Sequence, residues 1–366
     1  MINANKYLII LSLFFLVKVC NAQDKHYLGI SGHLGSLVPH HPEIAYHATG
    51  GIQGIEFNYM KQEFNNSFWD SIYHFPRYGA SYYFSNLSNN DVFGKIHSLH
   101  GFVDLPLSKN NGKFDIFFRF GFGLAYLTRA FNLEDNYLNS AIGSKTNIFV
   151  RLGLKTSFEL TPQLLWTNTL NFSHASNGNL KTPNLGLNLL TFSSGLLLSI
   201  ASNTSNKRPV MKTFIPGYEC MIGLAGGART YKWQSTRYFS AVSINMEFGR
   251  RLSYKYSAGM GVDFFKNNSL RAALKEDSVK HVHDIDTYQA GIHLYTDLHF
   301  KRIVLTFNIG TYIYTRYKYM FPMYNRLGFR YKINSRWLAN FTIKSHLSRA
   351  DYLEFGITYR VFPWEL

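Results

Sequence analysis

The chain has 366 residues, of which 17% are aromatic and 16% are charged, and its formal net charge at pH 7 is +16. So many aromatic side chains with so few charged ones are unusual for a soluble enzyme. Membrane-spanning strands with one apolar and one polar face produce this balance. A chain this basic usually binds nucleic acid, but the export signal described next argues against that partner.

The first 22 residues have the pattern of a secretory signal peptide. Lys6 precedes an apolar run from Tyr7 to Val17, and small residues stand where signal peptidase recognises the chain. The run is too short for a membrane-spanning helix. A lipid anchor on Cys20 is the alternative, but the three preceding residues lack the small side chains expected before a lipidated cysteine. Cleavage after Ala22 is expected, and it leaves Cys220 without a partner for an internal disulfide.

The remaining chain shows the alternation of membrane-spanning β-strands. From Phe114 to Tyr126 the even positions are all apolar, whereas Asp115, Arg119 and several small residues occupy odd positions. Similar alternation recurs up to the segment from Leu353 to Arg360. Period-two patterning over segments of roughly ten residues is the signature of transmembrane β-strands. We therefore predict an all-β fold, a closed antiparallel outer-membrane β-barrel that extends over residues 23–366.

The predicted number of strands is sixteen, which is even, as in single-chain bacterial barrels. Counts of twelve or fourteen remain open because strand boundaries are hard to place from sequence. The predicted strands begin near residues 26, 50, 77, 92, 113, 146, 162, 188, 217, 237, 252, 286, 302, 323, 336 and 351.

The lengths of the connections indicate an orientation in the membrane. If both termini are periplasmic, the connections from odd to even strands are extracellular, and they include the long segments 38–49, 130–144, 177–187 and 267–284. Most of the other connections are short, as periplasmic turns usually are. Residues 62–76 and the stretch from Ser202 to Thr213 fit this scheme badly. The second stretch is either a longer periplasmic link or a division between two sub-barrels.

The stretch from Asn171 to Asn188 is the one segment that looks built for chemistry. His174 and Ser176 are two residues apart, so on a strand both side chains leave the same face. That face is the apolar one, since Phe172 precedes them at the same parity. After a loop, Asn188 opens the next apolar run on the matching side. Three polar side chains are therefore predicted to meet on an otherwise apolar surface.

These residue types suit nucleophilic hydrolysis. A serine hydroxyl becomes a nucleophile when a neighbouring imidazole takes its proton, so Ser176 is the candidate nucleophile and His174 its base. Same-face neighbours on a strand are roughly 7 Å apart at Cα, so the two side chains must lean together or be brought together by a bulge. Asn188 can accept a hydrogen bond from the ring N–H of His174, although it supplies no charge.

The same stretch resembles the PagL-type lipid A 3-O-deacylases. Their pattern is His-x-Ser-Asn, then Pro-Asn-x-Gly, then an acidic residue twelve positions after the serine, where this chain has Asn188. The run from Asn136 to Ser144 is similar to a segment of longer acyloxyacyl-hydrolase relatives, and the resemblance covers about residues 27–201. The residues that match the pattern in order and spacing are His174, Ser176, Asn177, Pro183, Asn184 and Gly186.

The resemblance implies an outer-membrane serine esterase that removes an ester-linked acyl chain from lipid A through an acyl-serine intermediate. The acyl group expected to be removed is the 3-hydroxyacyl group at the 3-position of lipid A. The resemblance also implies an oxyanion site made by the backbone of Asn177 and Gly178 and the side chain of Asn184. Lipopolysaccharide and outer-membrane lipids are the expected partners, at the outer leaflet of the outer membrane. No cofactor, metal or protein partner is expected.

Asn188 keeps two alternatives open. Loss of the acidic residue there is also consistent with a catalytically inactive barrel of the same ancestry that binds lipid or passes solutes. If Asn188 is only structural in an active enzyme, Glu134 or Asp135 from the preceding outer loop would have to orient His174.

Other polar residues are predicted to have no catalytic role. The net charge falls to +14 once Lys6 and Lys18 leave with the signal peptide. Part of that charge is expected to meet the anionic surface of lipopolysaccharide, and part to line a polar lumen, as Arg119, Arg151 and Lys155 suggest.

No fixed ligand geometry is implied by the remaining candidate metal ligands, which are expected to be loop histidines without function: His33, His40, His41, His47, His281 and His283.

Overall fold

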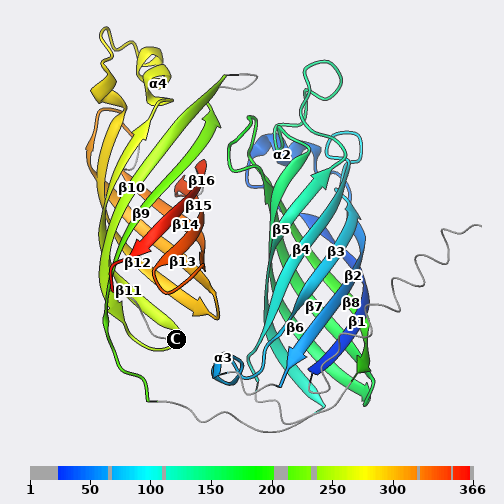
Figure 1. The fold of residues 1–366 in the computed structure, drawn as a ribbon. Coiled ribbons are helices and arrows are strands. Elements are labelled where there is room, and N and C mark those ends of the chain that lie inside the picture. Colours follow the sequence, from blue (N-terminus) through cyan, green and yellow to red (C-terminus); the bar gives the residue numbers. More distant parts are fainter. Residues whose placement is uncertain are drawn as a thin grey trace, which may run out of the picture.

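The computed structural model describes residues 24–64, 68–108, 113–201, 213–231, 237–319, 322–347 and 349–362. The predicted signal peptide, residues 1–22, lies outside these ranges. None of the helices in the described parts of the chain has the length and hydropathy that a membrane crossing requires. The fold is all-β, with sixteen strands in two closed antiparallel rings (Figure 1).

The first ring contains eight strands that pair in sequence order. β8 pairs with β1 from Leu37↔Leu189 to Tyr27↔Ser199, which closes the ring. Two short helices, α2 (Pro42–His47) and α3 (Phe68–Ile72), follow the first two strands. The strands are β1 (Asp24–Leu37), β2 (Ile52–Glu63), β3 (Arg77–Asn86), β4 (Lys95–Pro106), β5 (Phe114–Leu127), β6 (Thr146–Thr161), β7 (Leu164–Ser176) and β8 (Leu187–Ala201).

The second ring repeats this arrangement with the other eight strands. β16 pairs with β9 from Arg360↔Met221 to Phe355↔Gly226, which closes it. The helices α4 (Leu270–Glu276) and η2 (Asp284–Thr287) lie in one long connection. The strands are β9 (Tyr218–Thr230), β10 (Tyr238–Arg251), β11 (Tyr256–Asn267), β12 (Tyr288–Phe300), β13 (Ile303–Thr315), β14 (Met323–Lys332), β15 (Trp337–His346) and β16 (Arg349–Arg360).

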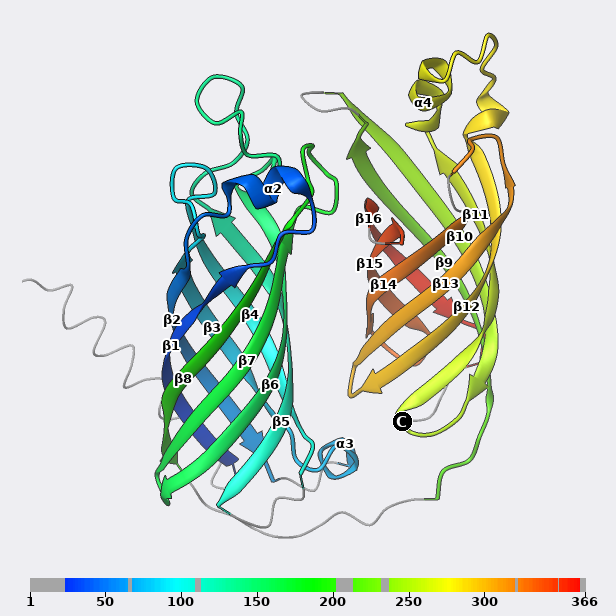
Figure 2. The same cartoon turned by 180° about the vertical axis from the view of Figure 1, so that it is seen from behind.

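The predicted count of sixteen strands is confirmed, but the strands form two rings instead of one barrel over residues 23–366 (Figure 2). The physical reason is the pairing of β8. Its backbone groups are hydrogen-bonded to β1 and β7, so it offers no free edge to β9. The stretch from Ser202 to Thr213 lies almost wholly outside the described residues, but the strands on either side of it belong to different rings. A division between two barrels was one of the two interpretations of that stretch.

Along the strands, exposed and mostly apolar side chains on the outer face alternate with buried side chains inside the ring, many of which are polar. On β7, Trp166 and Phe172 are exposed on the outer face, whereas Asn171 and Ser173 are buried inside. This matches the lipid-facing and interior-facing alternation predicted from the sequence.

Paired charges occupy the interior of the first ring. Glu56 forms ion pairs with Arg119 and Arg151, and Asp104 pairs with Arg119 and with Lys155. All five side chains are buried, so the three predicted basic residues do line the interior. Each buried charge has an opposite charge beside it, which offsets the cost of removing it from water.

The second ring is filled in the same way. Glu247 pairs with Arg330, and Asp263 pairs with Arg326 and His293. These side chains are also buried. The interiors of both rings therefore hold buried, paired charges.

The long connections gather at one end of the molecule. α2, the connection between β5 and β6, and α4 lie at the same end, whereas α3 lies at the opposite end (Figure 1). The four long segments expected on one side of the membrane all join an odd strand to an even one. β7 therefore ends, at Ser176, on the side of the long connections.

Candidate active site

The predicted catalytic residues lie where β7 ends and β8 begins. His174 and Ser176 leave β7 on its outer face, at the same parity as Trp166 and Phe172. In the antiparallel pairing of the two strands, Asn188 is the direct partner of His174. Because directly paired residues place their side chains on one face of a sheet, the register itself brings Asn188 beside the imidazole.

The three side chains form a continuous hydrogen-bonded chain. The His174 Nε2 atom lies 3.0 Å from the Ser176 Oγ atom. On the other edge of the ring, His174 Nδ1 lies 2.7 Å from the Asn188 Oδ1 atom. The two β7 side chains lean together without a bulge, since the irregularity in the pairing of β6 and β7 falls at Glu159 and Thr161. The arrangement has the geometry of a nucleophile, a base and a residue that orients the base.

His40 extends this chain by one further residue. It lies just after β1, where the Val38 N–H donates to the Asn188 backbone oxygen. The His40 Nδ1 atom is 3.0 Å from Asn188 Nδ2, and its Nε2 atom is 2.8 Å from the backbone oxygen of Leu185. The sequence did not reveal this contact, because nothing in the residue types distinguishes His40 from its neighbours His41 and His47. His40 was expected to have no function.

The Leu185 carbonyl determines the direction of every bond in the chain. A carbonyl oxygen only accepts, so His40 Nε2 carries the hydrogen and, in the neutral ring, Nδ1 accepts from the amide nitrogen of Asn188. The Asn188 oxygen must then face His174, where it accepts the Nδ1 hydrogen. His174 Nε2 is left with a free lone pair directed at the hydroxyl of Ser176. This is the tautomer that a general base requires.

The loop after the nucleophile differs in one respect from expectation. The backbone N–H of Asn177 donates to the Asn184 Oδ1 atom at 2.9 Å, so it is engaged and does not stand ready for an oxyanion. That bond uses the oxygen of Asn184 and leaves the Nδ2 group of its amide as a donor. Within the described residues, neither this Nδ2 group nor the Gly178 N–H has a hydrogen-bond partner. In the described loop that follows Ser176, these two groups are therefore donors without a partner.

The side chain of Asn177 holds two connections together. Its Nδ2 atom donates to Ser144 Oγ at 2.9 Å and to the Lys181 backbone oxygen at 2.8 Å. The Gly186 N–H donates to the backbone oxygen of Ala141 at 2.9 Å. The run from Asn136 to Ser144, singled out in the sequence, therefore supports the loop that follows the nucleophile.

Gly186 lies against the imidazole of His174. Its φ is +83°, in the region that favours glycine, and a Cβ added there would lie 2.6 Å from the His174 Cε1 atom. No side chain fits between this backbone and the ring. Glycine is therefore required at position 186 of this chain, because the imidazole occupies the space of a side chain.

Gly186→Ala should displace the His174 ring and lower ester hydrolysis by about a hundredfold or more, since small misplacements of catalytic groups have effects of that size. The measurement is kcat on an ester substrate, with heat-modifiable gel mobility as a check on barrel folding. Gly32→Ala is the matched control, because a Cβ at Gly32 on β1 meets nothing within 4 Å. Near-normal turnover of Gly186→Ala would contradict the assigned position of the imidazole.

The second ring contacts the loop between β7 and β8. The Asn179 side chain donates to the backbone oxygen of Asp351 at 3.2 Å, and the Thr182 N–H donates to Thr230 Oγ1 at 3.0 Å. At Gly178, with a φ of +62°, an added Cβ would lie 2.4 Å from the Leu353 side chain. The loop that carries the free donors thus packs on β9 and β16, a contact that the sequence did not reveal.

The other predicted polar residues lie elsewhere. The backbone N–H of Glu134 donates to Asn132, and the backbone oxygen of Asp135 accepts from Arg129, while Asn188 occupies the Nδ1 edge of His174. His33 is buried inside the first ring, 3.2 Å from Glu56, and is not a loop residue. Across the described ranges, no group of three or more His, Cys, Asp or Glu side chains is arranged to hold a metal ion.

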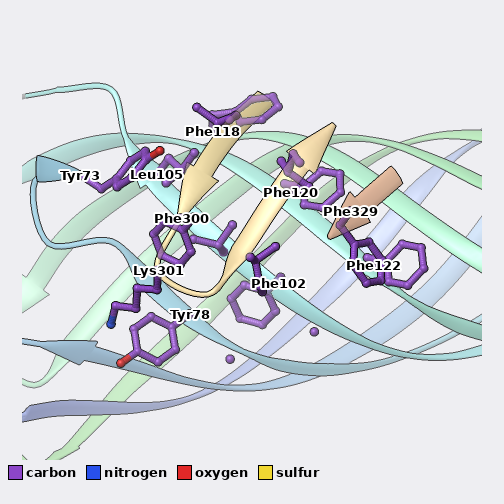
Figure 3. Close-up of a pocket in the computed structure, with 16 residues that line it drawn as sticks. Tyr73, Tyr78, Phe102, Leu105, Phe118, Phe120, Phe122, Phe300, Lys301 and Phe329 are labelled. Carbon is purple, nitrogen blue, oxygen red and sulfur yellow. The ribbon is translucent and has the colours of Figure 1, made fainter. Parts of the chain in front are cut away.

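An apolar cavity between the two rings is distinct from these residues. It has a volume of about 670 Å³ and is lined mainly by aromatic and aliphatic side chains from β3 to β5 and from β12 to β14, among them Phe102, Phe118, Phe122, Phe300 and Phe329 (Figure 3). His174, Ser176 and Asn188 are not among its lining residues. The cavity is therefore no part of the candidate active site.

Comparison with known proteins gives matches over both rings. Residues 56–196 match the family model described as lipid A 3-O-deacylase (PagL), and residues 218–364 match acyloxyacyl hydrolase, C-terminal domain. No curated protein matches the chain. The sequence resemblance extended only over about residues 27–201, so the match of the second ring adds to it.

Two solved structures illustrate the structural neighbours. Neisserial surface protein A (NspA) is 11% identical, with a TM-score of 0.32, and the match covers 48% of this chain and 97% of that chain. The Acinetobacter baumannii outer membrane protein Omp33 is 7% identical, with a TM-score of 0.17, and the match covers 93% of this chain and 99% of that chain. The family models, by contrast, span both rings and include the motif on β7, so the chain belongs to the PagL family of lipid A deacylases and is a β-barrel ester hydrolase.

Proposed function

We propose that the protein removes the 3-hydroxyacyl chain at the 3-position of lipid A through an acyl-serine intermediate. The observation that carries this proposal is the chain of hydrogen bonds from Ser176 through His174 to Asn188 on the outer face of the first ring. Ser176 is the nucleophile, His174 is the general base and acid, and Asn188 orients the imidazole.

The reaction proceeds in two halves. The Ser176 oxygen attacks the ester carbonyl carbon while His174 Nε2 takes the hydroxyl proton, and the negative charge develops on the former carbonyl oxygen. The Gly178 N–H and the Asn184 Nδ2 group donate to that oxygen. Collapse breaks the bond between the carbonyl carbon and the sugar oxygen, and that oxygen takes the proton that His174 received from Ser176. Water then attacks the acyl-serine while His174 takes its proton, and His174 gives that proton to the Ser176 oxygen as the fatty acid is released.

Asn188 supplies orientation without charge. In a serine protease, replacing the aspartate by asparagine costs about ten-thousandfold, largely because the amide stabilises the wrong tautomer of histidine. Here the His40 contact holds the amide so that its oxygen faces His174. Asn188 therefore orients His174 as an acidic residue would. It lacks only the negative charge that would stabilise the imidazolium.

The position of the residues suits a membrane lipid. They lie on the outer face of β7 and β8, next to the exposed side chains of Phe172 and Leu190, at the end where the long connections gather. Long connections are extracellular in outer-membrane barrels. In that orientation the site meets the outer leaflet, where the acyl chains of lipid A lie.

Mass spectrometry of lipid A tests the proposed function. Cells that produce the wild-type protein should contain lipid A lighter by one 3-hydroxyacyl chain than lipid A from cells that produce Ser176→Ala. The two proteins should be present in the membrane in equal amounts. Identical lipid A spectra would overturn the proposed activity, and loss of a different chain would overturn the 3-position.

A further inference from the structure

A second cavity lies between the β5–β6 connection and Lys181 of the loop that follows Ser176. It has a volume of about 430 Å³, and three of its lining residues are the cations Arg129, Lys145 and Lys181. Asp135 is the one carboxylate among the lining residues. We name this cavity the basic pocket.

In the part of the chain that the structure describes, the three cations have no acidic partner. None of them forms an ion pair within the described parts of the chain, and Arg129 donates to the backbone oxygen of Asp135 at 3.3 Å. This differs from the ring interiors, where basic side chains such as Arg119 and Lys155 face carboxylates. The positive charge of the basic pocket is therefore available to an anion from outside the chain.

The basic pocket adjoins the nucleophile through a single residue. Asn177 follows Ser176 directly, and its side-chain amide bonds to Ser144 and Lys181, which both line the pocket. At Gly143, also in the lining, an added Cβ would lie 2.8 Å from the backbone oxygen of Lys181. The β5–β6 connection thus contacts the β7–β8 connection at Ser144 and Gly143. These contacts lie between the basic pocket and Ser176.

We propose that the basic pocket binds a phosphate group on the sugar headgroup of the lipid substrate, while the acyl chains lie on the outer face of β7 and β8. This inference rests on the proposed function. A phosphate presents several oxygens to guanidinium and ammonium donors, and arginine in particular can hold two of them at once. Binding at this point fixes the sugar ring relative to Ser176, and so selects which ester bond reaches the nucleophile.

The test compares phosphorylated lipid A with the same lipid A after phosphatase treatment, using the purified full chain in detergent micelles. Wild-type kcat/KM should be higher for the phosphorylated form. The Lys145→Gln, Lys181→Gln double variant should reduce the ratio of the two kcat/KM values roughly fivefold or more, since an exposed ion pair is worth roughly two- to fivefold. Lys145→Glu with Lys181→Glu should bring the ratio below one.

Lys280→Gln is the matched control, because Lys280 is an exposed lysine on a long connection of the second ring. It should keep the wild-type ratio. A ratio that stays within about twofold of wild type in both double variants overturns the inference while leaving the proposed function intact.

A binding measurement separates failure of the inference from failure of the proposed function. Ser176→Ala should bind phosphorylated lipid A more tightly than the phosphatase-treated form in isothermal titration, and the double lysine substitution should remove the difference. If wild type hydrolyses neither lipid but this preference is seen, the proposed function fails and the basic pocket stands. Equal binding of both lipids refutes the basic pocket.

Discussion

Ser176→Ala and His174→Ala should each reduce lipid A deacylation by at least about ten-thousandfold, because a nucleophile and its base act as one unit and little remains when either is removed. Both side chains point outward from β7, away from the charged interior of the first ring, so neither substitution should prevent folding. The measurement is the initial rate of fatty acid release from lipid A in micelles. Gel mobility before and after boiling reports on the barrel.

Ser194→Ala is the matched control for the nucleophile. Ser194 is an outward-facing serine on β8, and its hydroxyl accepts a hydrogen bond from the Trp166 indole at 2.9 Å. This variant should keep its activity. A Ser176→Ala protein that still releases fatty acid at near the wild-type rate would exclude an acyl-serine at that position.

His40→Ala should reduce deacylation roughly ten- to a hundredfold, less than the roughly ten-thousandfold that a wrongly presented amide costs in a serine protease. Without His40, the Asn188 amide can turn its nitrogen toward His174 and favour the unreactive tautomer. Asn188→Glu removes this need, since a carboxylate presents only acceptors. In the Asn188→Glu background, His40→Ala should therefore leave the rate unchanged or raise it.

Wild type, His40→Ala, Asn188→Glu and the double variant form a double-mutant cycle. Their kcat values isolate the coupling between the side chains at positions 40 and 188. His41→Ala is the control for general disturbance of the segment, because the exposed His41 ring contacts His40 without a bond to Asn188. Equal losses from His40→Ala in both backgrounds would mean that His40 only supports the Leu185 loop. Full activity of Asn188→Ala would make position 188 structural.

The face of the strand on which each catalytic side chain lies could be predicted, because the alternation of apolar and polar residues shows which positions share a face. The alternation around Phe172 placed His174 and Ser176 on the outer face, and the matching parity of Asn188 placed it on the same side of β8. These inferences need only the period of two and the order of the strands. The direct pairing of His174 with Asn188 then brings these two side chains together, whereas the lean of Ser176 toward His174 is seen only in the structure.

The closure into two rings could not be predicted in this way. The apolar and polar residues of β8 would alternate in the same way whether β8 paired with β1 or with β9. The pattern therefore does not show which of these strands is its partner. The same holds for contacts between distant loops. His40 meets Asn188 across 148 positions of sequence, and Asn179 meets Asp351 across 172. Residue type alone does not distinguish His40 from its neighbour His41.

The outward direction of Ser176 and His174 determines how substrate and enzyme meet. With the first ring in the membrane as proposed, these side chains are on the same outer face as the exposed Phe172 and Leu190, and that face is directed at the acyl chains of the bilayer and not at an aqueous entrance. In that proposed placement, a lipid would reach them by lateral diffusion in two dimensions without leaving its leaflet. The encounter rate would then depend on the mole fraction of substrate in the membrane. Adding inert lipid would lower that rate, whereas adding buffer would not change it.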